Sequence, residues 1–356
     1  MTRRRVLFAA IAAITVCTMA LLTLGASAKN SSAKKTYNIY YSTSFNGNGY
    51  RVQSVNTMLA LLKPGAALAG RAKMTVVVSP QNTPASQIAS LHDIILKHPD
   101  AIIIQPSVSA ALAPVIQQAC NAGIVVGVWD SPVPNKCVYG WFMPIRQIGV
   151  LHGQWLAKAM HGHGVLFQDQ GLAGVLLAKT IIDGEDSVFK KYPGIKIVKF
   201  YGQFATGPTV QGVSALLTAH PDVAGVDDMA FIAGAFTAFE RAHHALVPMS
   251  SMPYNAGVID CVTLKGANCG FTYWPAYQAA YVLRTVLDVL DGKKQPHTQL
   301  VPTACVTTDG GSIGSLKCST FTSTIVSDAK LGSPEGAAPV TPPWANPPVT
   351  AKQVAS

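Results

Sequence analysis

The fold is decided by the stretch Asp100-Ala-Ile-Ile-Ile-Gln-Pro-Ser-Val-Ser-Ala-Ala-Leu-Ala-Pro-Val-Ile-Gln-Gln-Ala-Cys-Asn-Ala-Gly-Ile-Val-Val-Gly-Val-Trp-Asp130. Its apolar runs 101–104 and 124–128 have the length of strands, and apolar residues recur at helical spacing between them until Gly123 ends the helix. Two strands that are apolar on both faces and joined by a helix predict one βαβ unit. Such a unit belongs to a parallel sheet that helices cover on both sides.

Polar and aromatic residues follow these two strands directly. Gln105 ends the first apolar run, and Trp129 and Asp130 end the second. Ligands of parallel α/β sheets bind beyond the carboxyl ends of the strands, and a carboxylate that ends an all-apolar strand is costly unless it is used. We therefore expect Gln105, Trp129 and Asp130 to contact a ligand, although an aromatic residue at such a place can equally serve packing.

The composition is that of a compact, exported α/β protein. Of 356 residues, 49% are hydrophobic and 12% charged, so the chain can bury one large core or two of ordinary domain size. Three arginines at positions 3–5 precede an apolar run over 6–24 and the small residues Ala26-Ser-Ala28. This pattern predicts a signal peptide over 1–28. The alternative is an uncleaved anchor, because the run approaches the ~20 residues of a membrane span.

The charge distribution limits the classes of binding partner, and the cysteines indicate an oxidising compartment. The formal net charge is +10, but the basic residues are scattered and form no stripe with interleaved aromatics, so no nucleic-acid partner is expected. Beyond the leader, six cysteines predict disulfides in an exported chain. Several pairings remain open, and we expect the pairs that close short loops: Cys120 with Cys137, Cys261 with Cys269, and Cys305 with Cys318. Zinc binding by cysteine is the competing reading, but no Cys-x-x-Cys spacing occurs.

The remaining segments repeat the alternation of strand and helix. Expected strands cover 37–41, 74–78, 164–168, 196–201 and 223–226, with further extended segments at 258–264 and 267–273. One expected helix follows the polar loop 42–50 and runs to about Leu62, and the next follows Thr83 with Ile88, Leu91, Ile94, Ile95 and Leu96 on its buried side. Further helices are expected over 147–160, 210–219, 233–244 and 277–290, and a loop with a helix over 171–190. His98-Pro-Asp100 and His220-Pro-Asp222 each precede a strand, which indicates two lobes of one architecture. The Gly-x-Gly loop resembles a dinucleotide fingerprint, but Val52 stands in place of its third glycine.

The chain resembles the periplasmic solute-binding proteins of the ribose-binding type, which serve sugar ABC importers. The resemblance covers about residues 36–300 and rests on motifs that are specific only in combination and order. They are Pro80-Gln-Asn-Thr-Pro-Ala-Ser-Gln87, Pro99-Asp-Ala-Ile-Ile-Ile-Gln-Pro106, Ala119-Cys-Asn-Ala-Gly-Ile-Val-Val126, Lys191-Tyr-Pro-Gly-Ile-Lys-Ile-Val198, His220-Pro-Asp222 and Leu290-Asp-Gly-Lys293.

The resemblance implies two Rossmann-like α/β lobes with parallel sheets, joined by a three-crossing hinge. The implied first lobe covers 36–132 plus about 276–297, and the second covers 133–275 plus about 298–330. Asp130 is expected in the first crossing and Trp274 in the third. A Pro-rich tail follows over 331–356.

The implied ligand site combines hydrogen-bonding and aromatic residues. Sugars need planar donor and acceptor groups for their hydroxyls and an aromatic ring for their apolar face. The positions that match the family are Ser42, Asn46, Gln105, Asp130, Asp227, Asp228, Asn255 and Trp274, and of these Asp227 and Asp228 are both ambiguous. The aromatic role falls to Phe45, Trp129, Tyr273 and Trp274. Ser131 follows Asp130 where the family usually has arginine, and 177–180 lacks the arginines found there in the family. These departures put ribose itself in doubt.

Other chemistry finds little support in the sequence. His161-Gly-His163 and His243-His244 lie at the ends of expected helices, where histidine interacts well with the helix dipole, so no metal site and no cofactor are expected. A Gly-x-Ser-x-Gly elbow is missing. Asp183, Glu185 and Asp186 are interpreted as solvated charges on a surface helix, and no catalytic residue is assigned.

These observations predict a periplasmic, non-enzymatic binding protein. It is expected to act as a monomer, to close by hinge motion around a small polyhydroxylated ligand, and to dock on an ABC permease of the inner membrane. The alternative is a periplasmic sensing protein that presents its ligand to a chemoreceptor or sensor kinase. A periplasmic enzyme would differ from both by forming product.

Overall fold

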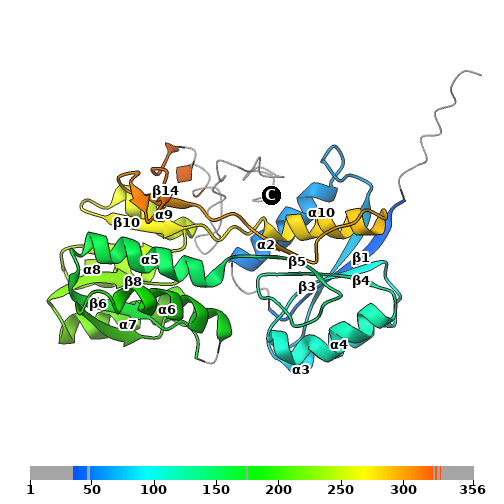
Figure 1. The fold of residues 1–356 in the computed structure, drawn as a ribbon, viewed down its shortest axis with the longest axis horizontal. Helices are drawn as coiled ribbons and strands as arrows, with labels where there is room; N and C mark the ends of the chain where they lie inside the picture. The colour runs from blue at the N-terminus through cyan, green and yellow to red at the C-terminus, as the bar shows by residue number, and fades with distance from the viewer. Residues whose placement is uncertain (1–34, 46–48, 174, 324, 327–328, 330–356) are drawn as a thin grey trace, which may run out of the picture. The chain divides into compact units, whose positions relative to one another are not determined.

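Two six-stranded sheets form the framework of the chain (Figure 1). The computed structural model describes residues 35–45, 49–173, 175–323, 325–326 and 329, so the expected signal peptide, the whole Pro-rich tail and Asn46 lie outside the described residues. The α/β class and the two mainly parallel sheets are as the sequence predicted.

The first sheet is parallel throughout. Its strands, in spatial order, are β11 (Thr298–Leu300), β5 (Tyr139–Phe142), β4 (Val125–Trp129), β3 (Ala101–Gln105), β1 (Tyr37–Thr43) and β2 (Ala72–Val78). Side chains alternate between its faces. Ala101 and Ile103 pack against α2 (Gly49–Leu62) and α10 (Gln278–Leu290) on one face. Ile102 and Ile104 pack against α3 (Pro84–Ile95) and α4 (Ser109–Asn121) on the other.

The second sheet has one antiparallel edge. Its order is β12 (Cys305–Thr307), β10 (Asn268–Thr272), β9 (Pro248–Ser251), β8 (Val223–Asp227), β6 (His163–Asp169) and β7 (Gly194–Phe200), and only the β10–β12 pair is antiparallel. One face packs on α7 (Thr206–Ala219), α8 (Ala233–Arg241) and α9 (Asn255–Thr263), and the other packs on α5 (Ile145–Ala159) and α6 (Leu176–Phe189). A hairpin, β13 (Ser312–Ile313) with β14 (Leu316–Lys317), follows.

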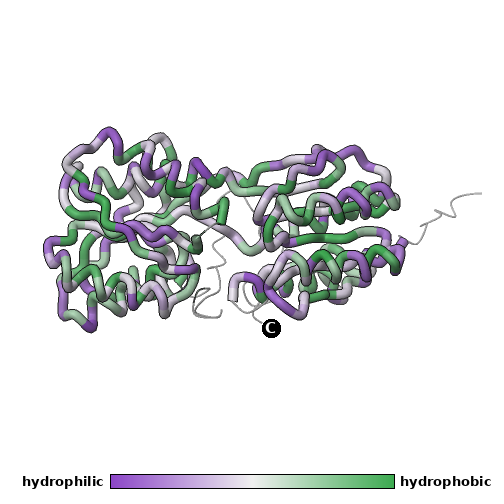
Figure 2. Tube along the Cα trace, turned by 90° about the horizontal axis from the view of Figure 1, so that it is seen from below, coloured by the Kyte–Doolittle hydropathy of each residue, from purple (hydrophilic) through white to green (hydrophobic). Residues whose placement is uncertain are grey.

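Hydropathy follows this layering in both sheet units, where apolar strand segments alternate with polar loops (Figure 2). Strand β3 is buried at all five positions, as expected for a central parallel strand covered on both faces. Among the described residues, no helix is both long and apolar enough to cross a membrane.

Within the described residues the chain passes between the sheets three times. The passage at Trp274 lies where the sequence placed one, whereas the first passage lies further along the chain than expected. After Asp130 it returns to the first sheet as β5, so the first passage follows Phe142. The second passage leads from β10 past Trp274 to α10, and the third joins β11 to β12. Strands β5 and β11 therefore lie in the first sheet, although the sequence analysis assigned both ranges to the second lobe.

Two further expectations about local structure were wrong. Residues 258–264 were expected to be extended, but they belong mainly to helix α9, where Val258 and Cys261 are buried in the core of the second sheet unit. Leu96 was expected on the buried side of α3, but it caps the helix and is 74% exposed. Tertiary packing decides the first case, and the end of the helix decides the second.

Helices α5 and α6 pack with their backbones in close approach. A Cβ atom added at Gly149 of α5 would overlap the carbonyl oxygen of Ile181 in α6, and one at Gly184 of α6 would overlap the carbonyl oxygen of Arg146. Gly153 continues the same contact one turn further along α5. Glycine is therefore required on both helices for them to lie this close.

The three disulfides have the pairing that the short loops predicted: Cys120 with Cys137, Cys261 with Cys269, and Cys305 with Cys318. The first joins the end of α4 to the segment before β5, the second joins α9 to β10, and the third joins β12 to the residue after β14. Each therefore fastens neighbouring elements of one sheet unit.

Loss of the Cys120–Cys137 disulfide should lower the free energy of unfolding by about 3 kcal/mol, because the bond closes a loop of 17 residues in the unfolded chain. Urea denaturation of the Cys120→Ser/Cys137→Ser double variant measures this. Reducing agent should destabilise the wild type further, because all three bonds then open. An unchanged urea midpoint in the double variant would show that this bond contributes nothing.

Candidate functional site

The carboxyl ends of three neighbouring strands bring polar side chains together at one edge of the first sheet. Gln105 at the end of β3 accepts hydrogen bonds at Oε1 from Tyr41 (3.0 Å) and from Thr43 (3.3 Å), both of β1. Its Nε2 donates to Oδ2 of Asp130, directly after β4, at 3.2 Å. Gln105 and Asp130 therefore lie together, because parallel strands end on the same side of the sheet, and their contact with a ligand stays a prediction.

Arg51 extends this network from the start of α2. Its Nη1 donates to Thr43 Oγ1 at 3.0 Å and to the carbonyl of Phe45 at 3.3 Å, and its guanidinium lies 5.9 Å from the centre of the Phe45 ring. Phe45 is 37% exposed, whereas Thr43 and Gln105 are fully buried. The network thus runs from the buried strand ends to a partly exposed aromatic ring and cation.

Asp130 has an unusual backbone. Its φ is 71°, in the left-handed region that residues other than glycine seldom adopt. Aspartate and asparagine tolerate this region best, because their short polar side chains can bond locally. Strain of this kind gathers at binding sites, where the surrounding structure holds it. The half-buried carboxylate is thereby aimed at the strand edge and toward Gln105.

Aromatic side chains lie beside the polar network. Tyr50 of α2 lies 6.1 Å from Trp129 and 6.0 Å from Tyr254, between ring centres, and Phe231 lies 5.0 Å from Tyr254. The Tyr50 hydroxyl accepts a hydrogen bond from Gln278 Nε2 at 2.5 Å. Tyr254 and Phe231 follow strands of the second sheet, so aromatic residues from both sheet units meet here.

Burial keeps the two tyrosines of this region neutral. Desolvation, with the nearby charge of Asp130, raises the pKa of Tyr50 well above its ordinary value. Desolvation also raises the pKa of Tyr41 far above its ordinary range, against a lowering by Arg51. Both hydroxyls therefore stay protonated at any physiological pH and can act as hydrogen-bond donors.

Two buried carboxylates lie at the carboxyl ends of strands β6 and β8 in the second sheet. Asp169 Oδ1, at the end of β6, accepts from the backbone N–H groups of Gly171 and Gly202, and Asp228 accepts from Ala230, Phe231 and Thr209. Burial raises the pKa of Asp169 to about 6, and burial together with the charge of Asp169 raises the pKa of Asp228 to about 8. The Asp228 carboxylate bonds to its own loop and to Thr209, so its contact with a ligand stays a prediction.

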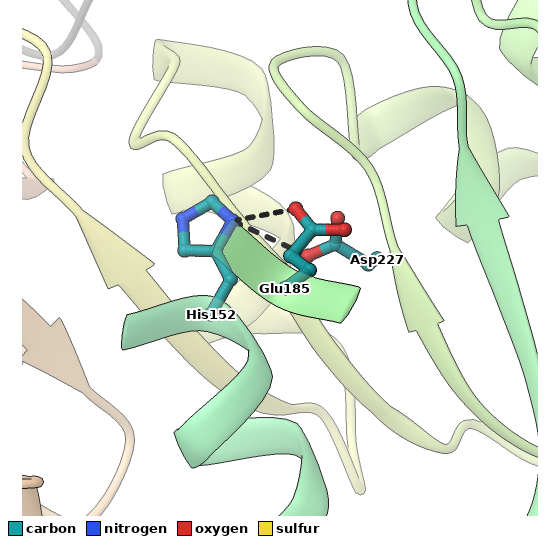
Figure 3. A group of neighbouring side chains, drawn as sticks. All are labelled: His152, Glu185 and Asp227. Atoms are coloured by element: carbon teal, nitrogen blue, oxygen red, sulfur yellow. Dashed lines mark ion pairs between the residues drawn. The ribbon is translucent and has the colours of Figure 1, made fainter. Parts of the chain in front are cut away.

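Beneath the second sheet lies a cluster of His152, Glu185 and Asp227, all three fully buried (Figure 3). The expectation that Glu185 is a solvated surface charge was wrong, because α6 turns it toward α5 and the sheet; Asp183 is exposed and Asp186 half-buried. Burial and the neighbouring Asp227 raise the pKa of Glu185 well above its usual value.

The other expected site residues are mostly covered by protein. Trp129 is fully buried, Trp274 is 3% exposed and packs in the same core as Tyr50, and Asn255 is buried at the start of α9, directly after Tyr254. Asn46 lies outside the described residues. The roles of these side chains toward a ligand therefore remain predictions.

The hydrogen-bonded residues at the carboxyl ends of β1, β3 and β4 form what we call the strand-edge network. Its members Tyr41, Thr43 and Arg51 were not predicted from the sequence, nor were Tyr50 and Tyr254, which lie beside it. A signal existed for Arg51, since it opens the first helix just after the polar loop that the sequence assigned to the ligand. None existed for Tyr254, because only the tertiary structure brings it to Tyr50.

Curated relatives of similar sequence bind sugars. The chain is 26% identical over 175 residues to the ribose import binding protein of Salmonella typhimurium, a match that spans 48% of this chain and 58% of that protein. It is 27% identical over 228 residues to the D-ribose/D-allose-binding protein of Pseudomonas aeruginosa, spanning 60% and 70% respectively. The match thus reaches little more than half the length of the ribose import protein.

Solved structures and a family model give the same result for the fold. A periplasmic solute-binding protein of an ABC transporter from Actinobacillus succinogenes 130z, with bound D-allose, superposes with a TM-score of 0.69 at 23% identity, covering 77% of this chain and 98% of that one. The family model described as periplasmic binding protein domain matches residues 39–294. With this match over most of its length, the chain belongs to the periplasmic binding protein family.

Proposed function

We propose that this protein is the periplasmic ligand-binding component of an ABC importer and that it binds a small polyhydroxylated molecule, a sugar or related polyol, without turnover. The ligand would lie at the carboxyl edges of the two sheets and be released to an inner-membrane permease. The sugar-binding relatives support this ligand class. A hinge motion at the three passages between the sheets would close the protein around its ligand.

The network of Thr43, Arg51, Gln105 and Asp130 is the observation that carries the proposal. It offers a carboxylate, an amide, a hydroxyl and a guanidinium at one strand edge. Planar groups of these types bond pairs of sugar hydroxyls, and an unpaired buried group costs about 1–3 kcal/mol, which discriminates between epimers.

The aromatic residues supply the second element of sugar recognition. Phe45 is the most accessible ring beside the network, with 37% of its surface exposed, whereas Trp129 is covered by Tyr50 and its neighbours. The apolar face of a sugar ring packs on aromatic side chains. A ligand that stacks on Phe45 could at the same time hydrogen-bond to Arg51 and Asp130.

A thermal-shift screen of the mature protein over pentoses, hexoses, polyols and sugar acids tests the ligand class. A ligand present at about 100 times its dissociation constant should stabilise the folded state by about 2.7 kcal/mol. Native mass spectrometry of protein from its own host should show the same ligand carried through purification. Recovery of the ligand with unchanged mass after long incubation with the protein would agree with binding without turnover.

A substitution of the exposed Phe45 tests whether the ligand stacks on this ring. Phe45→Leu keeps an apolar side chain but removes the ring, so it should weaken the binding of the screened ligand without changing the melting temperature of the free protein. No stabilisation by any compound of the panel would contradict the ligand class. Conversion of the ligand into a product would contradict a transport role.

A further inference from the structure

The buried cluster in the second sheet unit has the geometry of a cation site (Figure 3). His152 comes from α5, Glu185 from α6 and Asp227 from the end of β8. His152 Nδ1 lies 3.3 Å from Asp227 Oδ1 and 4.0 Å from Glu185 Oε1, and one donor atom from each residue lies within 4.8 Å of the other two. Three separate elements thus converge on one point in the protein interior.

His152 and Glu185 are each held by a neighbour on the side that faces away from this point. His152 Nε2 lies 2.7 Å from the hydroxyl of Thr272, and Gln168 Nε2 donates to Glu185 Oε2 at 2.8 Å. His152 Nδ1, Glu185 Oε1 and both carboxylate oxygens of Asp227 face one another, and in the described part of the chain none of them hydrogen-bonds to a group outside the cluster. Neighbours of this kind orient the ligands of metal sites, because they fix the histidine ring and the carboxylates.

The charges at the cluster call for a cation. Glu185 and Asp227 are fully buried, and within the described part of the chain neither forms an ion pair with lysine or arginine. Buried carboxylates are stable only when they are paired, protonated or bound to a metal. A divalent ion between two carboxylates and a neutral imidazole leaves the group with no net charge.

The spacing favours a metal over a hydrogen bond from His152 to either carboxylate, and a proton shared between Glu185 and Asp227 is the alternative to test. Charge-assisted N–H···O hydrogen bonds measure about 2.7–2.9 Å, shorter than either contact of His152 Nδ1. Zinc bonds of about 2.0–2.1 Å to nitrogen and oxygen in a tetrahedron place neighbouring ligand atoms roughly 3.3 Å apart. The contact between His152 Nδ1 and Asp227 Oδ1 has this length.

We propose that His152, Glu185 and Asp227 bind a divalent transition metal, with zinc as the best match, at a structural site beneath the second sheet. Imidazole nitrogen together with carboxylate oxygen suits zinc, and the three residues supply one donor atom each. The site is closed to solvent, so the metal clamps α5, α6 and β8 together and takes no part in ligand binding. The proposal is independent of the ligand at the strand edges.

Metal analysis of the mature, full-length chain is the first test. Protein purified without chelator should retain about one zinc per chain, and protein refolded with chelator should regain it with a Tm rise of about 5 °C or more. Cobalt(II) added to the metal-free protein should give the visible absorption of a tetrahedral site. No retained metal together with an unchanged Tm on adding zinc would overturn the proposal.

Glu185→Gln and its neighbour Asp186→Asn separate the metal from a proton. Asp186 lies next to Glu185 and accepts a hydrogen bond from the same Gln168 at 3.2 Å, but it is not a donor of the cluster. The E185Q variant should lose zinc and the zinc-dependent Tm rise, and D186N should keep both. If E185Q instead equals or exceeds the wild type in Tm while neither binds zinc, the cluster holds a proton and the proposal fails. Should E185Q not fold, the zinc content of D186N and of the wild type still decides.

Discussion

Replacing Asp130 with alanine should weaken ligand binding by about 10- to 100-fold while the protein still folds. The change removes the only carboxylate of the strand-edge network and leaves Gln105 Nε2 without its acceptor. Losing a charged hydrogen bond in a partly buried site costs about 1.5–3 kcal/mol, and each 1.4 kcal/mol is tenfold in affinity. Titration calorimetry with the ligand from the screen measures the change.

Folding and site effects of this variant are separable. Alanine at a φ of 71° adds backbone strain of about 1 kcal/mol, so the Tm of D130A should fall only slightly. Asp130→Asn tolerates that backbone and keeps one acceptor oxygen, so its affinity should lie between the other two. Asp93→Ala, an exposed carboxylate on α3, is the matched control and should bind as the wild type does. Wild-type affinity in D130A would remove Asp130 from the site.

Gly149→Ala, which adds one methyl group, should strongly destabilise the second sheet unit. The added Cβ would overlap the carbonyl oxygen of Ile181, a backbone atom that cannot rotate away, so α5 and α6 must separate. Overpacking of this kind costs about 1–3 kcal/mol and more when backbone has to move. Urea denaturation should show a lower midpoint with an unchanged slope.

Gly207→Ala is the matched control, because Gly207 also lies in a helix and nothing stands within 4 Å of an added Cβ there. Alanine has the higher helix propensity, so this variant should be as stable as the wild type or up to about 1 kcal/mol more stable. Equal midpoints for G149A and the wild type would show that the two helices are not held in close contact. Such a result would also weaken the case for a metal site at His152, Glu185 and Asp227, because these residues come together only if α5 and α6 are in close contact.

The strand-edge network shows which parts of a site are readable from sequence. Gln105 and Asp130 follow neighbouring apolar strands, and parallel strands end at one edge, so the order of residues alone brings them together. The three disulfides were readable for a similar reason, because each closes a short loop within one sheet unit. Local order along the chain was sufficient in both cases.

Helix α9 and Glu185 show where local order fails. The run at 258–264 is short and rich in β-branched residues, so strand and helix are equally compatible with it until Val258 and Cys261 pack in the core. Glu185 is charged and has charged neighbours, which is typical of a solvated helix face. Only the close approach of α5, permitted by Gly149 and Gly184, makes it a buried position.

By itself the sequence determined the α/β class, most of the strand and helix order and the strand-end residues, and it favoured the disulfide pairs that close short loops, because periodicity and short loops act over neighbouring residues. The tertiary structure alone decided where the chain passes between the sheets, which aromatic rings meet at Tyr50, and that His152, Glu185 and Asp227 share one buried point. These depend on packing between segments far apart in the chain, and no local pattern encodes such distances.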